Sequence, residues 1–306
     1  MKLTQLGMVG YGEVGKIITA GLQSHLQSAH VWDLKFANPI SVSTANTAPT
    51  EIQHATQAGF FACDGMKALC TASNFIISAV TASQTLAVAE EVARYINKGS
   101  VFLDLNSASP ATKQAASKVI EDAGGHYIEA GVMTSIGPYG IRVPMLLGGA
   151  IATDLAPQLL GFGMDVKVVS PDIGVASAIK MSRSVMIKGL EALVIESYTT
   201  ARQYGVEDHV LPTLAETFPS IDWQQTGAYF FSRVVQHGKR RAEEMRESAN
   251  TVKEAGFEPI MTSAIAKKHD WVAGLARDGV FDGLEKKPKW QDYADRLIAH
   301  SKYKPD

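Results

Sequence analysis

Lys180 stands where a primary amine could do acid–base chemistry. It lies in a proline-free stretch, 174–202, with apolar residues at helical spacing. On such a helix Ser184 lies about 40 degrees and Glu191 about 20 degrees around the axis from Lys180, so the three side chains share one face. An amine desolvated there would have its pKa lowered toward neutrality, as a base that accepts an alcohol proton requires. The ordinary alternative is a solvated lysine beside a simple pair of Lys188 with Glu191.

A glycine-rich segment near the N-terminus is typical of a turn that binds a dinucleotide. An apolar run of strand length, 3–9, precedes it and helical apolar spacing follows over 16–22. In this setting the glycines permit a tight turn, the approach of backbone amides to a pyrophosphate, and close packing of helix on strand. The helix N-terminus adds unpaired N–H groups. We therefore predict that the cofactor NAD is bound by Gly10, Tyr11, Gly12, Glu13, Val14 and Gly15.

A second predicted strand, His30 to Asp33, ends in a carboxylate. A dinucleotide site commonly holds the adenosine ribose with an acid at this place. Asp33 therefore favours NAD over NADP, because a 2′-phosphate would meet a like charge. Lys35 follows two residues later and leaves NADP possible. The alternative for Asp33 is a solvated strand end.

The order of the predicted elements indicates an α/β fold with a Rossmann-type, doubly wound parallel sheet. Ser109 is predicted to cap a helix that Pro110 opens. Ligands of such sheets bind at the carboxyl ends of the strands, so strand-end residues are expected at the cofactor. These are Val80, Thr81 and Asn106, with Ser107 beside them. Besides the first two, strands are predicted at 75–80, 101–105, 126–129, 144–147 and 166–169.

After Pro171 the strand pattern stops and only helical patterns follow. We predict a dinucleotide-binding domain over 1–170 and an all-helical domain for substrate and dimerisation over 171–306, joined by the long helix over 174–202. The polar segment 37–57 is expected to be irregular. Further helices are predicted at 207–218, 223–236, 239–255, 259–276 and 290–301.

Composition is that of a soluble enzyme of about two domains. The chain has 306 residues, 46% of them hydrophobic, and a net charge of -2, which argues against nucleic acid as a partner. Cys63 and Cys70 lack metal-ligand spacing, so neither a metal site nor a disulfide framework is expected. No apolar run approaches membrane-spanning length and no leader pattern opens the chain, so we expect a cytoplasmic protein without a membrane partner.

Four motifs in order make the chain similar to the β-hydroxyacid dehydrogenases, the family of 3-hydroxyisobutyrate and phosphogluconate dehydrogenases. They are the glycine turn, the strand end at 104–107, the loop at 129–135 and the lysine after a helix start that contains Gly174. The resemblance covers essentially the whole length. It implies that Lys180 removes a hydroxyl proton while hydride leaves the same carbon for nicotinamide. It also implies substrate contacts from Ser107, Met133, Thr134 and Ser135.

The chain also departs from that family's pattern. Where the family has Ser-Gly-Gly, this loop has Met133, Thr134 and Ser135. The general acid of the decarboxylating branch falls on Ile187, which cannot donate a proton, so oxidative decarboxylation is not expected. Guanidinium groups bind carboxylate or phosphate in a forked geometry, and a basic cluster follows in the helical part. Expected substrate contacts are therefore Arg183, Ser184, His237, Arg240 and Arg241, with a solvated basic helix as the alternative for the cluster.

The sequence thus predicts an NAD-dependent oxidoreductase acting on the β-hydroxyl carbon of a small hydroxyacid. Two alternatives stay open. One is an imine reductase, which shares the architecture but usually lacks the lysine; the other is a non-catalytic redox sensor that binds NAD(H). A homodimer is also expected, because one apolar run exceeds what a single buried face uses, unless that run lies inside its own domain. The run contains Tyr229, Phe230, Phe231, Val234 and Val235.

Overall fold

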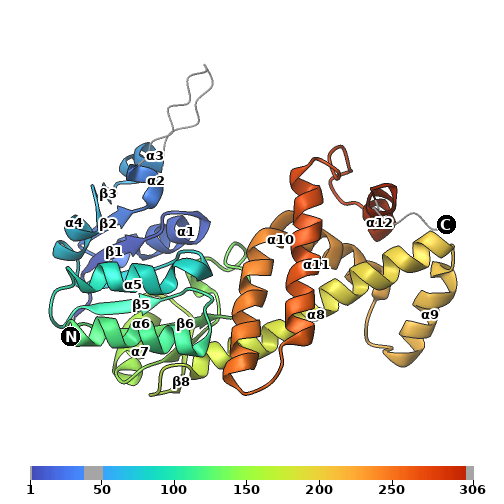
Figure 1. Cartoon of the computed structure of the whole chain (residues 1–306). Helices are drawn as coiled ribbons and strands as arrows, with labels where there is room; N and C mark the ends of the chain where they lie inside the picture. Colours follow the sequence, from blue (N-terminus) through green and yellow to red (C-terminus); the bar gives the residue numbers. More distant parts are fainter. Residues whose placement is uncertain (1, 38–50, 301–306) are drawn as a thin grey trace. The chain divides into compact units, whose positions relative to one another are not determined.

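A computed structural model describes residues 2–37 and 51–300 of the chain (Figure 1). It divides into two compact units, Met1–Met181 and Ser182–Asp306. The dividing point lies inside the long helix α8 (Val175–Tyr204), whereas the sequence places the boundary at 170/171, directly after the last strand. The first turns of α8 therefore count with the sheet unit.

The first unit is built on one eight-stranded sheet in the order β3-β2-β1-β4-β5-β6-β7-β8. All neighbouring pairs are parallel except β6 with β7, which is antiparallel. The order reverses between β1 and β4, so the predicted doubly wound, Rossmann-type sheet is confirmed. The strands are β1 (Gln5–Val9), β2 (Ser28–Trp32), β3 (Phe61–Ala62), β4 (Phe75–Ser78), β5 (Val101–Asp104), β6 (His126–Val132), β7 (Met145–Gly148) and β8 (Val166–Ser170).

Helices cover both faces of this sheet. A Cβ added to Gly7 in β1 would meet Leu69 of α4, whereas one added to Gly15 of α1 would come within 3.5 Å of the next strand residue, Met8. Successive strand residues point to opposite faces, so α4 and α1 lie on opposite sides. Figure 1 shows α5 and α6 side by side on one face. The helices are α1 (Glu13–Leu22), α2 (Leu34–Ala37), α3 (Glu51–Gln57), α4 (Met66–Thr71), α5 (Thr85–Ala93), α6 (Pro110–Asp122) and α7 (Ala152–Gly161).

The start of α6 agrees with the sequence prediction, whereas α3 was not predicted. The Oγ of Ser109 accepts a hydrogen bond from the N–H of Thr112, so the predicted cap is present. The prediction of an irregular segment over 37–57 is wrong for its last part, since residues 51–57 form α3. Residues 38–50 of that prediction lie outside the described part of the chain. Helix α3 is short and mostly polar, so its sequence carries little apolar periodicity.

The second unit is all-helical, as predicted. One correction concerns the two helices predicted at 223–236 and 239–255, which form the single continuous helix α10 with Gly238 in its interior. A Cβ at Gly238 would lie 2.9 Å from the carbonyl oxygen of His269 and 3.0 Å from Cβ of Ala273, so this glycine permits close packing on α11. Figure 1 shows α10 and α11 side by side. The unit contains the rest of α8, then α9 (Glu207–Thr217), α10 (Trp223–Glu254), α11 (Ile260–Arg277) and α12 (Trp290–Ala299).

Aromatic side chains form much of this unit's core. Tyr198 of α8 and Trp290 of α12 meet edge to face with ring centroids 4.9 Å apart. The apolar run predicted to mediate dimerisation is divided: Phe231 and Val234 are fully buried in the core, whereas Tyr229 is 58% exposed. None of the described helices combines the length and apolar composition needed to cross a bilayer.

Candidate active site

The glycine turn joins β1 to α1 at the point where the strand order reverses. Gly10 has φ of 88 degrees, and a Cβ there would lie 2.5 Å from the carbonyl oxygen of Ala79, after β4. Gly12 is the N-cap of α1, and no side chain caps the helix there. A Cβ added to Gly12 would meet nothing within 4 Å. The space above the helix N-terminus is thus open, as a pyrophosphate requires. Next in α1 come exposed Glu13, half-buried Val14 and buried Gly15.

Asp33 is bound to the glycine turn itself. Its Oδ2 accepts the N–H of Tyr11 at 2.8 Å, and its Oδ1 accepts the N–H of Lys35 at 3.0 Å. A carboxylate has about four lone-pair positions, so each oxygen retains capacity for a ribose hydroxyl. The structure thus brings Asp33 beside the turn, as the sequence predicts, and fixes it through backbone donors.

Asn106 connects two neighbouring strand ends. Its Oδ1 accepts the N–H of Val80 at 2.7 Å and its Nδ2 donates to Oγ of Ser78 at 3.0 Å. The Asn106 side chain is buried and shapes the turn after β4, where the Thr81 side chain is exposed. The residues predicted at the carboxyl ends of β4 and β5 therefore lie together.

Lys180 contacts the neighbouring strand end through Ser107. Its Nζ donates to Oγ of Ser107 at 2.6 Å, although the two residues are 73 positions apart in sequence. Gly131 in β6 makes this approach possible, because a Cβ there would lie 3.0 Å from the carbonyl oxygen of Ala176 and 3.6 Å from Cβ of Lys180. The amine and the hydroxyl form a half-buried pair at the carboxyl end of the sheet.

Glu129 holds the start of α8 in place, a role that sequence reasoning missed. Its fully buried carboxylate accepts hydrogen bonds from the N–H groups of Gly174 at 2.7 Å, Ala176 at 3.0 Å and Ser177 at 3.3 Å. The hydroxyl of Ser177 donates a fourth, at 2.8 Å. A negative charge on the N-terminal amides of a helix is electrostatically favourable. Glu129 thereby fixes the helix one turn before Lys180.

A second buried carboxylate, that of Asp104, holds the backbone next to Ser107. Asp104 accepts hydrogen bonds from Nζ of Lys113 at 2.9 Å, the hydroxyl of Tyr127 at 2.6 Å and the N–H of Asn106 at 2.8 Å. Burial, and next the charge of Asp104, raise the pKa of the Tyr127 hydroxyl well above its ordinary value, so it remains a donor. The cluster fixes the backbone that carries Asn106 and Ser107.

The predicted substrate loop follows β6. The N–H of Met133 donates to the carbonyl oxygen of Pro144 at 2.9 Å, which anchors the start of the loop. Met133 and Ser135 are half-buried and Thr134 is exposed. This loop continues directly from Gly131, the glycine on which α8 packs.

In the second unit, Ser184 is buried and accepts a hydrogen bond from Nζ of Lys188 at 3.0 Å. Nζ of Lys188 also lies 3.0 Å from Oε2 of Glu244, so this buried lysine is paired with an acid of α10. Arg183 is exposed. Arg240, also exposed, lies 3.8 Å from Glu244.

Arg241 does not present its charge to solvent. Its buried guanidinium binds the carboxylate of Glu191 through both Nε, at 2.8 Å, and Nη2. Burial raises the pKa of Glu191, against the effect of Arg241. The sequence therefore misplaced Arg241 as a substrate anchor: it faces inward and neutralises a buried acid. His237 is half-buried, and buried His269 lies 3.8 Å from Glu191.

Comparisons with known proteins bear on both units. Residues 5–138 match a family model described as the NAD binding domain of 6-phosphogluconate dehydrogenase, so the chain carries an NAD-binding domain. Residues 201–272 match a domain of unknown function, DUF1932.

The described residues contain no group of three or more His, Cys, Asp or Glu that could hold a metal ion.

Several solved structures resemble the whole chain. A conserved hypothetical protein from Sinorhizobium meliloti 1021 is 31% identical over 97% of both chains, with a TM-score of 0.75. A conserved protein described as structurally similar to 3-hydroxyacid dehydrogenases is 28% identical over 89% of this chain and 98% of its own, with a TM-score of 0.66. Mycobacterium tuberculosis 3-hydroxyisobutyrate dehydrogenase shares the fold, at 14% identity over 97% of this chain and 99% of its own, with a TM-score of 0.69.

Proposed function

Because the chain belongs to the β-hydroxyacid dehydrogenase family, we propose that it oxidises the β-hydroxyl carbon of a small hydroxyacid with NAD, or catalyses the reverse reduction. The observation that carries this proposal is the pair formed by Nζ of Lys180 and Oγ of Ser107 at 2.6 Å. It combines a primary amine and a hydroxyl at the carboxyl end of a dinucleotide-binding sheet, where ligands of such folds bind.

The cofactor contacts that we propose are those whose local geometry suits a dinucleotide. The open N-terminus of α1 would receive the pyrophosphate, and the remaining lone pairs of Asp33 would accept ribose hydroxyls. When bound, nicotinamide supplies the acceptor for a hydride. NAD is the proposed cofactor and NADP is not excluded. The full proposed set is Gly10, Tyr11, Gly12, Glu13, Val14, Gly15, Asp33, Val80, Thr81 and Asn106.

Lys180 is proposed as the base in oxidation. Its neutral amine takes the hydroxyl proton while the C–H electron pair leaves as hydride, so the carbon becomes a carbonyl and Lys180 becomes an ammonium. That ammonium then donates a hydrogen bond to the new carbonyl oxygen. Ser107 holds Nζ of Lys180 from one side and orients it. In reduction the same ammonium returns the proton.

The substrate contacts are proposed on the family resemblance together with local geometry. Ser107 accepts the hydrogen bond from Nζ of Lys180. Met133, Thr134 and Ser135 follow Gly131, the residue of β6 against which α8 packs. Arg183, Ser184, His237 and Arg240 are retained as proposed contacts to an acidic group. Arg241 is not, because Glu191 already binds its guanidinium.

The test is turnover of a panel of β-hydroxyacids, followed as NADH absorbance, by the wild-type protein and Lys180→Ala. We expect turnover by the wild type, a loss of at least about a thousandfold in the variant, and little change in its NADH affinity. Lys118→Ala is the matched control, since Lys118 is an exposed lysine on α6 that pairs with Asp122. Full turnover by Lys180→Ala would contradict the proposal.

The same assay separates the alternatives. Rapid reduction of cyclic imines with no hydroxyacid turnover would favour an imine reductase. Tight NADH binding with no turnover of either panel would favour a redox sensor. We also propose a homodimer, for which a light-scattering mass near twice 32.9 kDa is the expected result. A mass near 32.9 kDa would contradict the dimer alone. The cytoplasmic location remains a prediction.

A further inference from the structure

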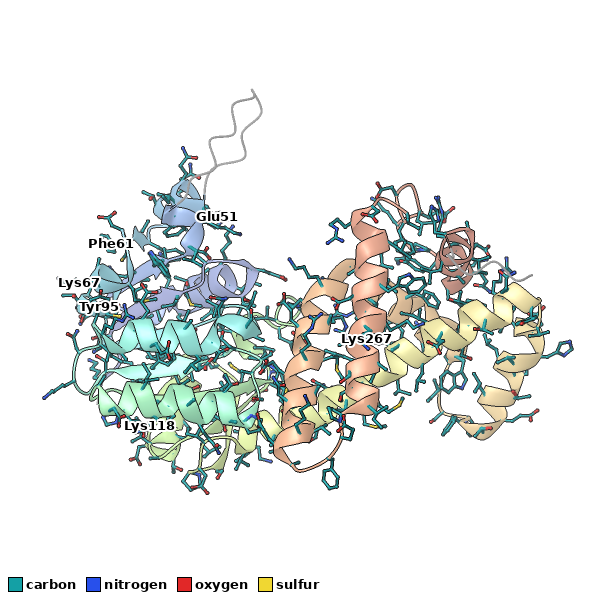
Figure 2. The ribbon with its side chains drawn as sticks, viewed as in Figure 1. Glu51, Phe61, Lys67, Tyr95, Lys118 and Lys267 are labelled. Carbon is teal, nitrogen blue, oxygen red and sulfur yellow. The ribbon has the colours of Figure 1, made fainter. Side chains whose placement is uncertain are left out.

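Glu51 pairs with two lysines at the edge of the sheet. Its Oε2 lies 2.5 Å from Nζ of Lys16, and its Oε1 lies 4.0 Å from Nζ of Lys35. Lys16 belongs to α1, Lys35 to α2 and Glu51 to the first turn of α3. Figure 2 shows Glu51 at α3, well separated from the labelled Lys118 of α6. One carboxylate thus holds cations from two elements.

These lysines flank the strand end that carries Asp33. The backbone N–H of Lys35 donates to Asp33 Oδ1, and the N–H of Tyr11 donates to Oδ2. Nζ of Lys16 lies 5.8 Å from the ring centroid of Tyr11. The Tyr11 hydroxyl in turn lies 3.2 Å from Nδ1 of His54, so α3 also contacts the turn directly. Both cations therefore lie around the place where an adenosine ribose would meet Asp33.

Local charge decides what this place would accept. Asp33 and Glu51 supply two negative charges, and Lys16 and Lys35 supply two positive charges, so the group is neutral. Asp33 accepts two backbone N–H groups and opposes an anion with its single negative charge. Without Glu51, the group would carry a net positive charge, and two lysines would be available to a phosphate.

We propose that Glu51 is a specificity-determining residue that keeps the dinucleotide site selective for NAD(H) by holding Lys16 and Lys35. This inference rests on the proposed cofactor role of the glycine turn and Asp33. Glu51 acts on the 2′ position of the adenosine ribose, the one place where NAD and NADP differ chemically. It contacts neither Lys180 nor Ser107 in any of the interactions above, so its effect is expected on binding rather than on turnover.

The test compares the affinities of the wild-type protein and Glu51→Gln for NADPH and NADH, measured by nicotinamide fluorescence without substrate. Glutamine keeps a hydrogen-bond acceptor for Lys16 but removes the charge. We expect the Kd for NADPH to fall about tenfold, because a phosphate then meets one more net positive charge in partly solvated surroundings. The Kd for NADH should stay within about twofold, because NADH has no group at that position.

Asp122→Asn is the matched control, since it removes one carboxylate from an exposed ion pair on α6. It should leave both Kd values unchanged, and added salt should shrink the gain of Glu51→Gln. Adding Lys35→Ala to Glu51→Gln should cancel part of that gain. Thermal unfolding confirms that each variant is folded, and Lys35→Glu in the wild-type background, expected to weaken NADPH binding, tests the idea without altering α3.

The outcomes separate this inference from the proposed function. A folded Glu51→Gln protein whose Kd values match those of the wild type would overturn the role of Glu51 alone. An equal fall in the Kd for NADPH in Asp122→Asn would also overturn it, because the effect would then come from the net charge of the protein and not from the position of Glu51. A wild-type protein that binds neither NADH nor NADPH would overturn the proposed function and this inference together.

Discussion

Replacing Glu129 by glutamine tests how Lys180 is positioned. In the wild-type protein, one oxygen of Glu129 accepts the N–H groups of Gly174 and Ala176, and the other accepts the N–H and the hydroxyl of Ser177. Glutamine keeps one accepting oxygen and places an NH2 donor where the other stood. Two donors at the start of α8 then face a donor in a fully buried place.

The magnitude follows from those contacts. A hydrogen bond to a charged acceptor contributes about 1.5 to 3 kcal/mol, so the loss of two should lower the free energy of unfolding by about 4 kcal/mol. A domain stability of roughly 5 to 15 kcal/mol leaves Glu129→Gln folded. The start of α8 lies one turn before Lys180, and a misplacement of about 1 Å in a catalytic group can cost about a hundredfold in kcat. The Kd for NADH should change little, because Gly10 to Gly15 are not touched.

The role of Glu129 is tested by measuring urea unfolding, kcat, KM and the Kd for NADH on the same variants. Ser177→Ala is the graded control: it removes only the hydroxyl donor, at 2.8 Å, and should cost about 2 kcal/mol, half the loss in Glu129→Gln, with a much smaller loss of kcat. Glu129→Gln with wild-type stability and kcat would refute the reasoning. A fall in NADH affinity equal to the fall in kcat would also refute it, because general unfolding would then explain both.

Two further predictions concern other parts of the fold. Burial, with Arg241 and Lys188 nearby, lowers the pKa of His269 from 6.5 to about 3, so as pH falls below 6.5 only the unfolded chain takes up this proton. His269→Leu should therefore abolish a loss of about 2 kcal/mol in unfolding free energy between pH 8 and pH 5, and equal pH dependence in urea unfolding would contradict it. Gly10 has φ of 88 degrees, and a Cβ there would collide with the carbonyl oxygen of Ala79, so Gly10→Ala should distort the turn and raise the Kd for NADH about a hundredfold. An unchanged Kd in a fluorescence titration would exclude a role of this turn in binding the cofactor.

Most of the sheet could be predicted because its strands are buried on both faces. Phe75–Ser78 and Val101–Asp104 are continuous apolar runs apart from their last residues, and such runs are visible in sequence. β3, with the residues Phe61–Ala62, is too short to carry a pattern. The antiparallel direction of β7 depends on pairing with β6, a long-range property that spacing does not contain.

The candidate site was predicted where local geometry dictates residue type. The turn needs a positive φ at position 10, which favours glycine, so the sequence alone identifies this position. The contact of Lys180 with Ser107 joins residues 73 positions apart, so spacing placed each on its element but could not join them. For Arg241, adjacent basic residues on a helix point in different directions, and only packing against Glu191 shows which one is buried.

The most direct test of the central claim is chemical rescue of Lys180→Ala. If the primary amine at position 180 transfers the hydroxyl proton, added small alkylamines should restore part of the lost turnover, in proportion to their concentration and with dependence on amine basicity. Lys118→Ala, which removes an exposed lysine, should show no response to amines. Turnover in Lys180→Ala that equals the wild type before any amine is added would contradict the account.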